Sequence, residues 1–297
     1  MYRSVRILSR EQAEKLIERD FPDDAAVLCF YDPGENPPDY SPVCRRVLFL
    51  PEQDLSPDSL QAAGRTVQNF FPQAKQAAEF IGQAAAEGKQ IICQCRYGQG
   101  RSAGCAAAIL EYFEGKALDI FTDFSCSPNQ LIYRKLLRAL RKKMGPERWL
   151  HGEISGELPV SVVQAEKLNE VPFSQNTAAI CFYDPYMKPI SLPRDCGRQL
   201  HICLEDLEME DLKAENMTLG QYFPEAGRTA EFIRQAAADG LHILCISACG
   251  TGLSAGCAAA ILQFYFKAGL RIFADVRYAP NKLVYYKIRT ALEQGTV

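Results

Sequence analysis

The strongest constraint on this chain is an internal repeat with a constant spacing of 152 residues. The pentapeptide Cys-Phe-Tyr-Asp-Pro at 29–33 recurs at 181–185, and residues 102–110 recur unchanged at 254–262. Because the spacing is the same in both comparisons, no insertion separates the copies over most of their length. We therefore expect one fold written twice, and residues found in only one copy become candidates for function.

The 297 residues are enough for two domains. We expect domains over residues 1–145 and 158–297, joined by a linker over 146–157 that contains the only tryptophan, Trp149. We also expect the two domains to pack against each other within the chain.

Apolar runs alternate with helical patterns along each copy. A capping box of Ser9 and Gln12 marks the first helix, and Ser161 and Gln164 repeat that pattern in the second copy. The alternation predicts an α/β fold in each domain, with a mainly parallel sheet flanked by helices. Ligands of such sheets bind at the carboxyl ends of the strands. In the first copy we expect strands at 5–8, 25–31, 46–50 and 90–94, and helices at 9–18, 73–86, 102–114 and 127–140.

One segment of the first copy has the features of an anion site. Cys95-Arg96-Tyr97-Gly98-Gln99-Gly100-Arg101-Ser102 follows the expected strand at 90–94 and opens the small-residue helix. Loop amides and the helix dipole favour a bound anion and the thiolate form of a cysteine at this position. Arg101 can clamp two phosphate oxygens, and Ser102 can hydrogen-bond the sulfur. The segment therefore predicts a cysteine-dependent phosphatase that binds phosphate through residues 96–101.

This octapeptide resembles the signature loop of the protein tyrosine phosphatase superfamily, and most closely that of its dual-specificity branch. The family usually has histidine directly before the cysteine, where this chain has Gln94. The resemblance implies hydrolysis of a phosphomonoester through a phosphocysteine on Cys95. It also implies that the reaction needs no metal and no cofactor.

The resemblance further implies an aspartate on a separate loop that protonates the leaving oxygen. Asp54, just after the third expected strand, is our candidate, with Glu52 and Asp58 as alternatives on the same loop. Asn129, in Ser-Pro-Asn at 127–129, resembles a family element whose asparagine braces the signature loop with its side chain. Pro at the first position of a helix would give the same pattern without any contact to the loop.

Two further sets of residues flank the expected site. Arg96, together with Arg45 and Arg46, could attract an anionic substrate, although solvated surface charge explains these residues equally well. Asp32 and its repeat Asp184 are present in both copies. We therefore interpret these two aspartates as structural.

The second copy lacks the two groups that carry the chemistry. Ser247 stands in the place of Cys95, and Leu253 in the place of Arg101. A serine without a base is a poor nucleophile, and leucine cannot bind phosphate. Cys249 lies two residues further along and is expected to point away from the anion position. We predict a degenerate, pseudophosphatase domain whose role is either structural or regulatory.

Composition narrows the class of protein. A net charge of −3 gives no support for a nucleic-acid or anionic-membrane partner. Most of the 12 cysteines sit in apolar runs, as expected for buried thiols in a reducing, cytoplasmic compartment. With three histidines and no Cys-x2-Cys pair, a zinc site is not expected.

The substrate stays open at the level of sequence. A phosphotyrosyl or other phosphorylated protein is favoured over a small phosphomonoester, because Tyr97 and Gln99 stand where inositol-phosphate enzymes of this superfamily often carry lysine. Tandem inositol polyphosphate phosphatases keep that alternative. A tandem rhodanese-like sulfurtransferase and a pure binding module are alternatives of other classes.

Overall fold

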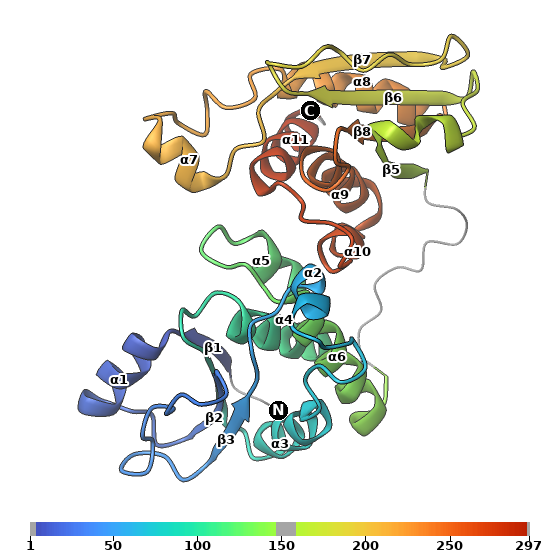
Figure 1. Ribbon diagram of the computed structural model, residues 1–297. Helices are drawn as coiled ribbons and strands as arrows, with labels where there is room; N and C mark the ends of the chain where they lie inside the picture. Colours follow the sequence, from blue (N-terminus) through green and yellow to red (C-terminus); the bar gives the residue numbers. More distant parts are fainter. Residues whose placement is uncertain (1–3, 147–158, 296–297) are drawn as a thin grey trace. The chain divides into compact units, whose positions relative to one another are not determined.

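The computed structural model describes residues 4–146 and 159–295, and these residues divide into two compact units, Met1–Leu150 and His151–Val297. Almost all of the expected linker at 146–157, including Trp149, lies outside the described residues. Each unit contains one four-stranded parallel sheet (Figure 1). The predicted α/β class with parallel sheets flanked by helices is confirmed.

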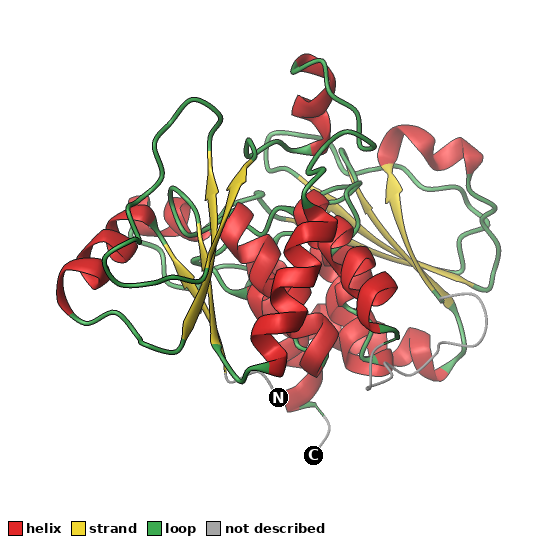
Figure 2. Ribbon diagram, turned by 90° about the horizontal axis from the view of Figure 1, so that it is seen from below, coloured by secondary structure: helices red, strands yellow, loops and turns green. Residues whose placement is uncertain are grey.

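In the first unit the strand order is β1-β4-β2-β3. The strands are β1 (Ser4–Leu8), β2 (Ala25–Tyr31), β3 (Val47–Pro51) and β4 (Gln90–Gln94). The helices are α1 (Arg10–Arg19), α2 (Pro57–Ala62), α3 (Ala74–Ala86), α4 (Arg101–Glu114), α5 (Ala117–Thr122) and α6 (Gln130–Met144). Because all four strands run in one direction, their carboxyl ends meet at a single edge, where the loops after β2, β3 and β4 begin (Figure 2).

Both faces of this sheet are covered. On one face, α1 and the β2–β3 loop supply Ala13 and Tyr40 to a cluster with Val27, Cys29 and Ile92. The other face is covered by α4, which lies against β1, β2 and β4, and by α3, which lies against β4. Burial on both sides explains why β2 and β4 read as continuous apolar runs rather than as alternating strands.

The second unit repeats the topology, with the order β5-β8-β6-β7. Its elements are β5 (Val160–Gln164), the 3₁₀ helix η1 (Ala165–Glu170), β6 (Thr177–Tyr183), β7 (Arg198–Cys203), α7 (Met209–Ala214), α8 (Ala226–Ala238), β8 (His242–Ser247), α9 (Leu253–Phe266), α10 (Leu270–Phe273) and α11 (Lys282–Gln294). None of the described helices in either unit is both long and apolar enough to cross a membrane.

The two copies differ at their first helix. The capping box at Ser9 is confirmed, with Ser9 Oγ accepting from the Gln12 amide, but the box expected at Ser161 is wrong. Val5 pairs with Ile91, and Val160 pairs with Ile243, so the spacing of the first strand is 155 residues and that of its neighbour 152. Counted between paired positions of the sheet, the chain from β5 to β6 is therefore three residues shorter than the chain from β1 to β2. As a result, Ser161 lies within β5 and does not cap a helix.

Two short helices were not expected. The loop predicted after β3 contains α2, where Ser56 and Ser59 form a capping box and Pro57 stands at the first position. The second, α5, begins at Ala117 soon after α4 ends. Both are too short to show a helical period in the sequence.

Candidate active site

The signature loop joins β4 to α4 at the carboxyl edge of the first sheet. The central position of β4 between β1 and β2 fixes the start of the loop, and the Cys95 amide donates to the Leu8 carbonyl at 3.2 Å. Gly98 has φ +73°, and a Cβ there would lie 2.8 Å from the Ser9 nitrogen, so the turn requires glycine. The loop therefore packs closely against the main chain at the end of β1.

The Cys95 thiol lies at the buried floor of this loop. Its Sγ is 3.0 Å from Ser102 Oγ, and both side chains are buried. Gln94, also buried, donates from Nε2 to the Cys95 carbonyl at 2.8 Å and accepts from Cys29 Sγ at 2.9 Å. Burial raises the pKa of Cys29 to about 12, so this neighbouring cysteine is a neutral thiol that can donate. Of the Cys29 and Cys95 thiols, that of Cys95 lies in the loop beside the Ser102 hydroxyl.

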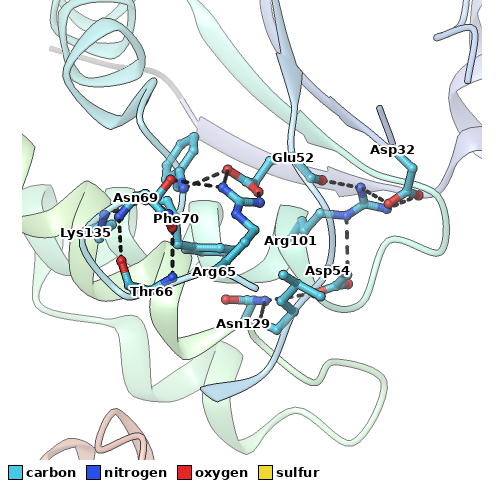
Figure 3. A network of polar contacts seen from close by, with 12 residues as sticks. Asp32, Glu52, Asp54, Arg65, Thr66, Asn69, Phe70, Arg101, Asn129 and Lys135 are labelled. Atoms are coloured by element: carbon cyan, nitrogen blue, oxygen red, sulfur yellow. Dashed lines mark hydrogen bonds and ion pairs between the residues drawn. The ribbon is translucent and has the colours of Figure 1, made fainter. Parts of the chain in front are cut away.

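Arg101, the first residue of α4, is 2% exposed and is held on two sides (Figure 3). Asp32, directly after β2, accepts from Nη1 and Nη2 at 3.1 and 3.0 Å. The Glu52 carbonyl, directly after β3, accepts from Nη1 at 2.6 Å. Acceptors at the ends of two neighbouring strands thus fix the orientation of the guanidinium. The flexible arginine side chain would not hold one orientation without them.

One edge of that guanidinium remains for a ligand. Asp32 bridges the two terminal nitrogens, so the remaining edge presents the Nε hydrogen and one Nη2 hydrogen. Nε is buried and has no hydrogen-bond partner within residues 4–146 and 159–295. The nearest carboxylate oxygen is Asp54 Oδ2, 3.8 Å away. An unpaired pair of parallel donors is the geometry that binds two oxygens of a phosphate.

Asp54 lies against the signature loop. A Cβ on Gly100 would come within 2.2 Å of Asp54 Oδ2, so only glycine allows this approach. Asn129 donates from Nδ2 to Asp54 Oδ1 at 2.8 Å and to the Leu55 carbonyl at 3.0 Å (Figure 3). The structure therefore brings together three separate segments, which carry Asp54, the signature loop with Arg101, and Asn129.

Asn129 braces the site differently from the expectation. Its Oδ1 caps α6 by accepting from the Ile132 amide at 3.0 Å, which turns Nδ2 toward the Asp54 loop. The signature loop is instead held by backbone amides, with Ser127 donating to the Gln99 carbonyl and Asn129 to the Gly100 carbonyl. One residue thus ties together the two loops.

The alternative acids are placed elsewhere. Glu52 is 1% exposed, and its carboxylate accepts from the Arg65 guanidinium and from the Phe71 amide. It cannot serve as a proton donor in this position. Asp58 lies exposed in the first turn of α2.

The rim of the site carries balanced charge. Arg96 Nη1 bonds Glu35 Oε1 at 2.9 Å, and its guanidinium lies over the Tyr97 ring, which is 67% exposed. The idea that Arg46 attracts substrate is wrong. Arg46 precedes β3, at the opposite edge of the sheet, where it pairs with Glu87 at 2.8 Å.

Asp32, Glu52 and Arg65 make contacts at or next to the site that the sequence did not reveal. Because Asp184 repeats Asp32 in a copy that lacks the arginine, the sequence favoured a structural role for Asp32. Its position at the end of a strand of a parallel sheet was the available signal. Nothing in the spacing of Glu52 and Arg65 indicated that they would pair.

The second copy keeps the shape of the site without its reactive groups. Gly250 has φ +68°, and Ser247 Oγ lies 2.8 Å from Ser254 Oγ. Leu253 is buried where Arg101 stands in the first copy. Asp206 accepts from Asn281 Nδ2 at 2.7 Å, as Asp54 does from Asn129.

Cys249 differs from the expectation. Its sulfur accepts from Thr251 Oγ1 at 3.2 Å, and the Thr251 and Gly252 amides also donate to it. Partial burial raises the pKa of this thiol, but these three donors outweigh that effect and the net pKa is lowered. The Cys249 sulfur therefore faces loop amides rather than pointing away from them.

The described residues contain no cluster of three His, Cys, Asp or Glu side chains suited to a metal ion. No protein-family model matches the chain, and no curated protein matches it. Among solved structures, the chain is similar to Tk-PTP in the active form, with 19% identity over 50% of this chain and 85% of that one, at a TM-score of 0.28. It is also similar to PTPMT1, with 16% identity over 48% of this chain and 94% of that one, at a TM-score of 0.29.

Proposed function

We propose that the first unit is a cysteine-dependent phosphomonoester hydrolase and that the second is its catalytically inactive duplicate. The observation that carries the proposal is the open Nε–Nη2 edge of Arg101 in the same loop as the Cys95–Ser102 pair. A clamp for phosphate oxygens and a nucleophile thus share one short loop. In the second unit both the clamp and the nucleophile are replaced, by Leu253 and Ser247.

The reaction proceeds in two steps. The Cys95 thiolate attacks phosphorus, an S–P bond forms, and the P–O bond to the leaving group breaks while Asp54 transfers its proton to the departing oxygen. Water then attacks phosphorus and gives a proton to Asp54, and the S–P bond breaks. The hydroxyl of Ser102 hydrogen-bonds the sulfur as it leaves.

Arg101 and the loop amides stabilise the charge that develops on the equatorial oxygens. Because Asp32 and the Glu52 carbonyl already fix the guanidinium, little reorganisation is needed in the transition state. The Asp54 carboxylate lies near the same edge of Arg101, 3.8 Å from Nε. Asp54 is therefore close to the position that a phosphate bound at that edge would take.

The substrate we propose is a phosphotyrosyl protein, with dual-specificity activity as an extension. Arg96 is paired with Glu35, and Arg101 with Asp32, so the site offers no surplus of positive charge for a polyanion. Tyr97 is exposed on the loop and can stack against an aromatic leaving group. Both features disfavour inositol polyphosphates, which need several cations.

The test compares the full chain with two single variants on p-nitrophenyl phosphate, a tyrosine phosphopeptide and inositol hexakisphosphate. Cys95→Ser should abolish turnover while tungstate, a phosphate analogue, still binds. Ser247→Ala is the matched change in the second copy and should keep full activity. Turnover that survives Cys95→Ser would refute the assignment. Thiosulfate is assayed in parallel, and its cleavage in place of phosphate release would identify a sulfurtransferase instead.

A further inference from the structure

An ion pair between the buried Glu52 and the partly exposed Arg65 lies behind the catalytic arginine. Arg65 donates from both terminal nitrogens to the Glu52 carboxylate, and its Nη2 reaches Oε2 at 3.2 Å (Figure 3). The Phe71 amide donates to the same Oε2 at 2.7 Å, and Arg65 also donates to the Asn69 carbonyl at 3.0 Å. Glu52 is thus locked at its side chain by charge-assisted hydrogen bonds.

The main chain of Glu52 forms part of the site. Its carbonyl accepts from Arg101 Nη1 at 2.6 Å, and its amide donates to the Tyr31 carbonyl at 3.0 Å. Tyr31 directly precedes Asp32, the other partner of Arg101. Asp54 follows Glu52 by two residues. A displacement of Glu52 would therefore move the arginine and both aspartates that surround it.

The second copy shows that the fold does not need these charges. Leu204 and Met217 stand 152 residues after Glu52 and Arg65. The backbone contacts persist, because the Leu204 amide donates to the Tyr183 carbonyl at 3.0 Å. The Met217 amide also donates to the Leu212 carbonyl at 2.8 Å.

The turn next to the pair keeps its conformation as well. Phe71 has φ +46°, and its counterpart Phe223 has φ +55°. Leu204 is buried, as Glu52 is. Apolar residues can therefore stand at both positions without changing the backbone contacts of the loop.

The charges thus occur only in the copy that has a catalytic arginine. We propose that Glu52 and Arg65 are positioning residues, which fix the Glu52 carbonyl so that it aims Arg101 at phosphate. This inference rests on the proposed function for the reaction it serves. Its structural part, the aim of Arg101 toward an oxyanion, can be measured without turnover.

The test transfers the pair of the second copy into the first, as the double variant Glu52→Leu with Arg65→Met. We expect a thermal midpoint within about 4 °C of the wild type. We expect kcat on p-nitrophenyl phosphate to fall about 10- to 100-fold, because a small misplacement of a catalytic group has effects of that size. The tungstate dissociation constant, measured by calorimetry, should rise by a similar factor.

The matched control is another ion pair of the same unit, at the far edge of the sheet. Arg46→Met with Glu87→Leu removes a 2.8 Å ion pair and should leave kcat and tungstate binding unchanged. Arg65→Lys keeps the charge but not the two-pronged contact, and should lose less activity than Arg65→Met. That lysine variant also decides the matter if the double variant does not fold.

The two proposals fail in different ways. Wild-type kcat and tungstate affinity in the folded double variant would overturn the positioning role, as would unchanged kcat in Arg65→Lys if the double variant does not fold. If the wild type binds tungstate but hydrolyses no phosphomonoester, the proposed function fails, and the tungstate constants alone decide the positioning role. If the wild type binds no tungstate, both proposals fail.

Discussion

The Asp32 carboxylate bridges the two terminal nitrogens of Arg101, at 3.1 and 3.0 Å. The bridge occupies one edge of the guanidinium and leaves the Nε–Nη2 edge for a ligand. Asp184 recurs in the second copy, where the arginine is replaced by Leu253. There its Oδ1 accepts from the Tyr186 amide at 2.9 Å instead. The repeated aspartate therefore has different partners in the two copies. Asp32 binds an arginine in the first copy, and Asp184 stabilises a local turn in the second.

Asp32→Asn should reduce kcat/KM about 10- to 100-fold, because hydrogen bonds to a charged group contribute about 1.5–3 kcal/mol. The amide can accept at one position only, and its own N–H groups oppose the guanidinium. Steady-state kinetics on p-nitrophenyl phosphate measures the loss. Asp184→Asn is the control and should have no kinetic effect, and equal losses in both variants would argue for a general effect on folding.

Asp54→Asn should slow turnover most for substrates with poor leaving groups, by about 100- to 10,000-fold for alkyl phosphates. Activated aryl phosphates need little protonation and should lose less. The same change removes a negative charge 3.8 Å from Arg101 Nε, so tungstate should bind more tightly. A leaving-group series combined with calorimetry tests both effects. A uniform loss across the series would remove Asp54 from the role of acid, and Asp206→Asn should leave all these rates unchanged.

Asp206 should make the stability of the second unit depend on pH. Asp206 is partly exposed, but its carboxylate packs against Gly252. The resulting loss of hydration raises the pKa of Asp206 above the ordinary 3.8. Hydrogen bonds from Asn281 and from the Leu253 amide oppose this effect but are weaker. The folded state then binds more protons than the unfolded state, so the contribution of Asp206 to stability falls as pH rises through the raised pKa.

Asp206→Asn removes that titration. Relative to the wild type, the variant should therefore gain stability as the pH is raised from 4 to 7. Urea unfolding across this range, followed by a probe specific to the second unit, measures the difference. A difference that stays constant, or that shrinks as pH rises, contradicts the assigned shift.

Cys249 should react with iodoacetamide faster than Cys203, the other exposed thiol among the described cysteines. Hydrogen bonds from Thr251 and Gly252 lower the Cys249 pKa and increase its thiolate fraction at neutral pH. Limited alkylation followed by peptide mass spectrometry gives the two rates. Thr251→Val removes one donor and should slow Cys249 without affecting Cys203, whereas equal rates in the wild type would show that the donors have no effect on the thiol.

Much of the fold was predictable because it depends on local pattern. Strand β4 was predicted over the residues where it occurs, and the Ser9 capping box was found as expected. The error at Ser161 arose because the prediction assumed a spacing of 152 residues at the first strand. The pairing of β5 with β8 sets that spacing to 155 residues, which is three residues more. Such a shift is visible only in the sheet.

The site was predictable to the extent that it lies within one loop. Cys95, Arg101 and Ser102 are close in sequence, and their proximity follows from a strand, a turn and a helix. Asp32 and Arg65 reach the site from other segments, 69 and 36 residues away from Arg101 along the chain. The family resemblance implied Asp54 in spite of such a distance, but no motif indicated Asp32 or Arg65 as partners of the loop.

The residues alone indicate a duplicated α/β protein, in which the first anion loop has Cys95 and Arg101 where the second has Ser247 and Leu253. Repetition, periodicity and composition are local properties, and they are read directly from the residues. The orientation of Arg101 depends instead on contacts between distant segments, with the Asp32 carboxylate, the Glu52 carbonyl and the Glu52–Arg65 pair behind it. A parallel sheet brings the ends of distant segments to one edge, so the partners of a catalytic side chain are chosen by strand order rather than by sequence spacing.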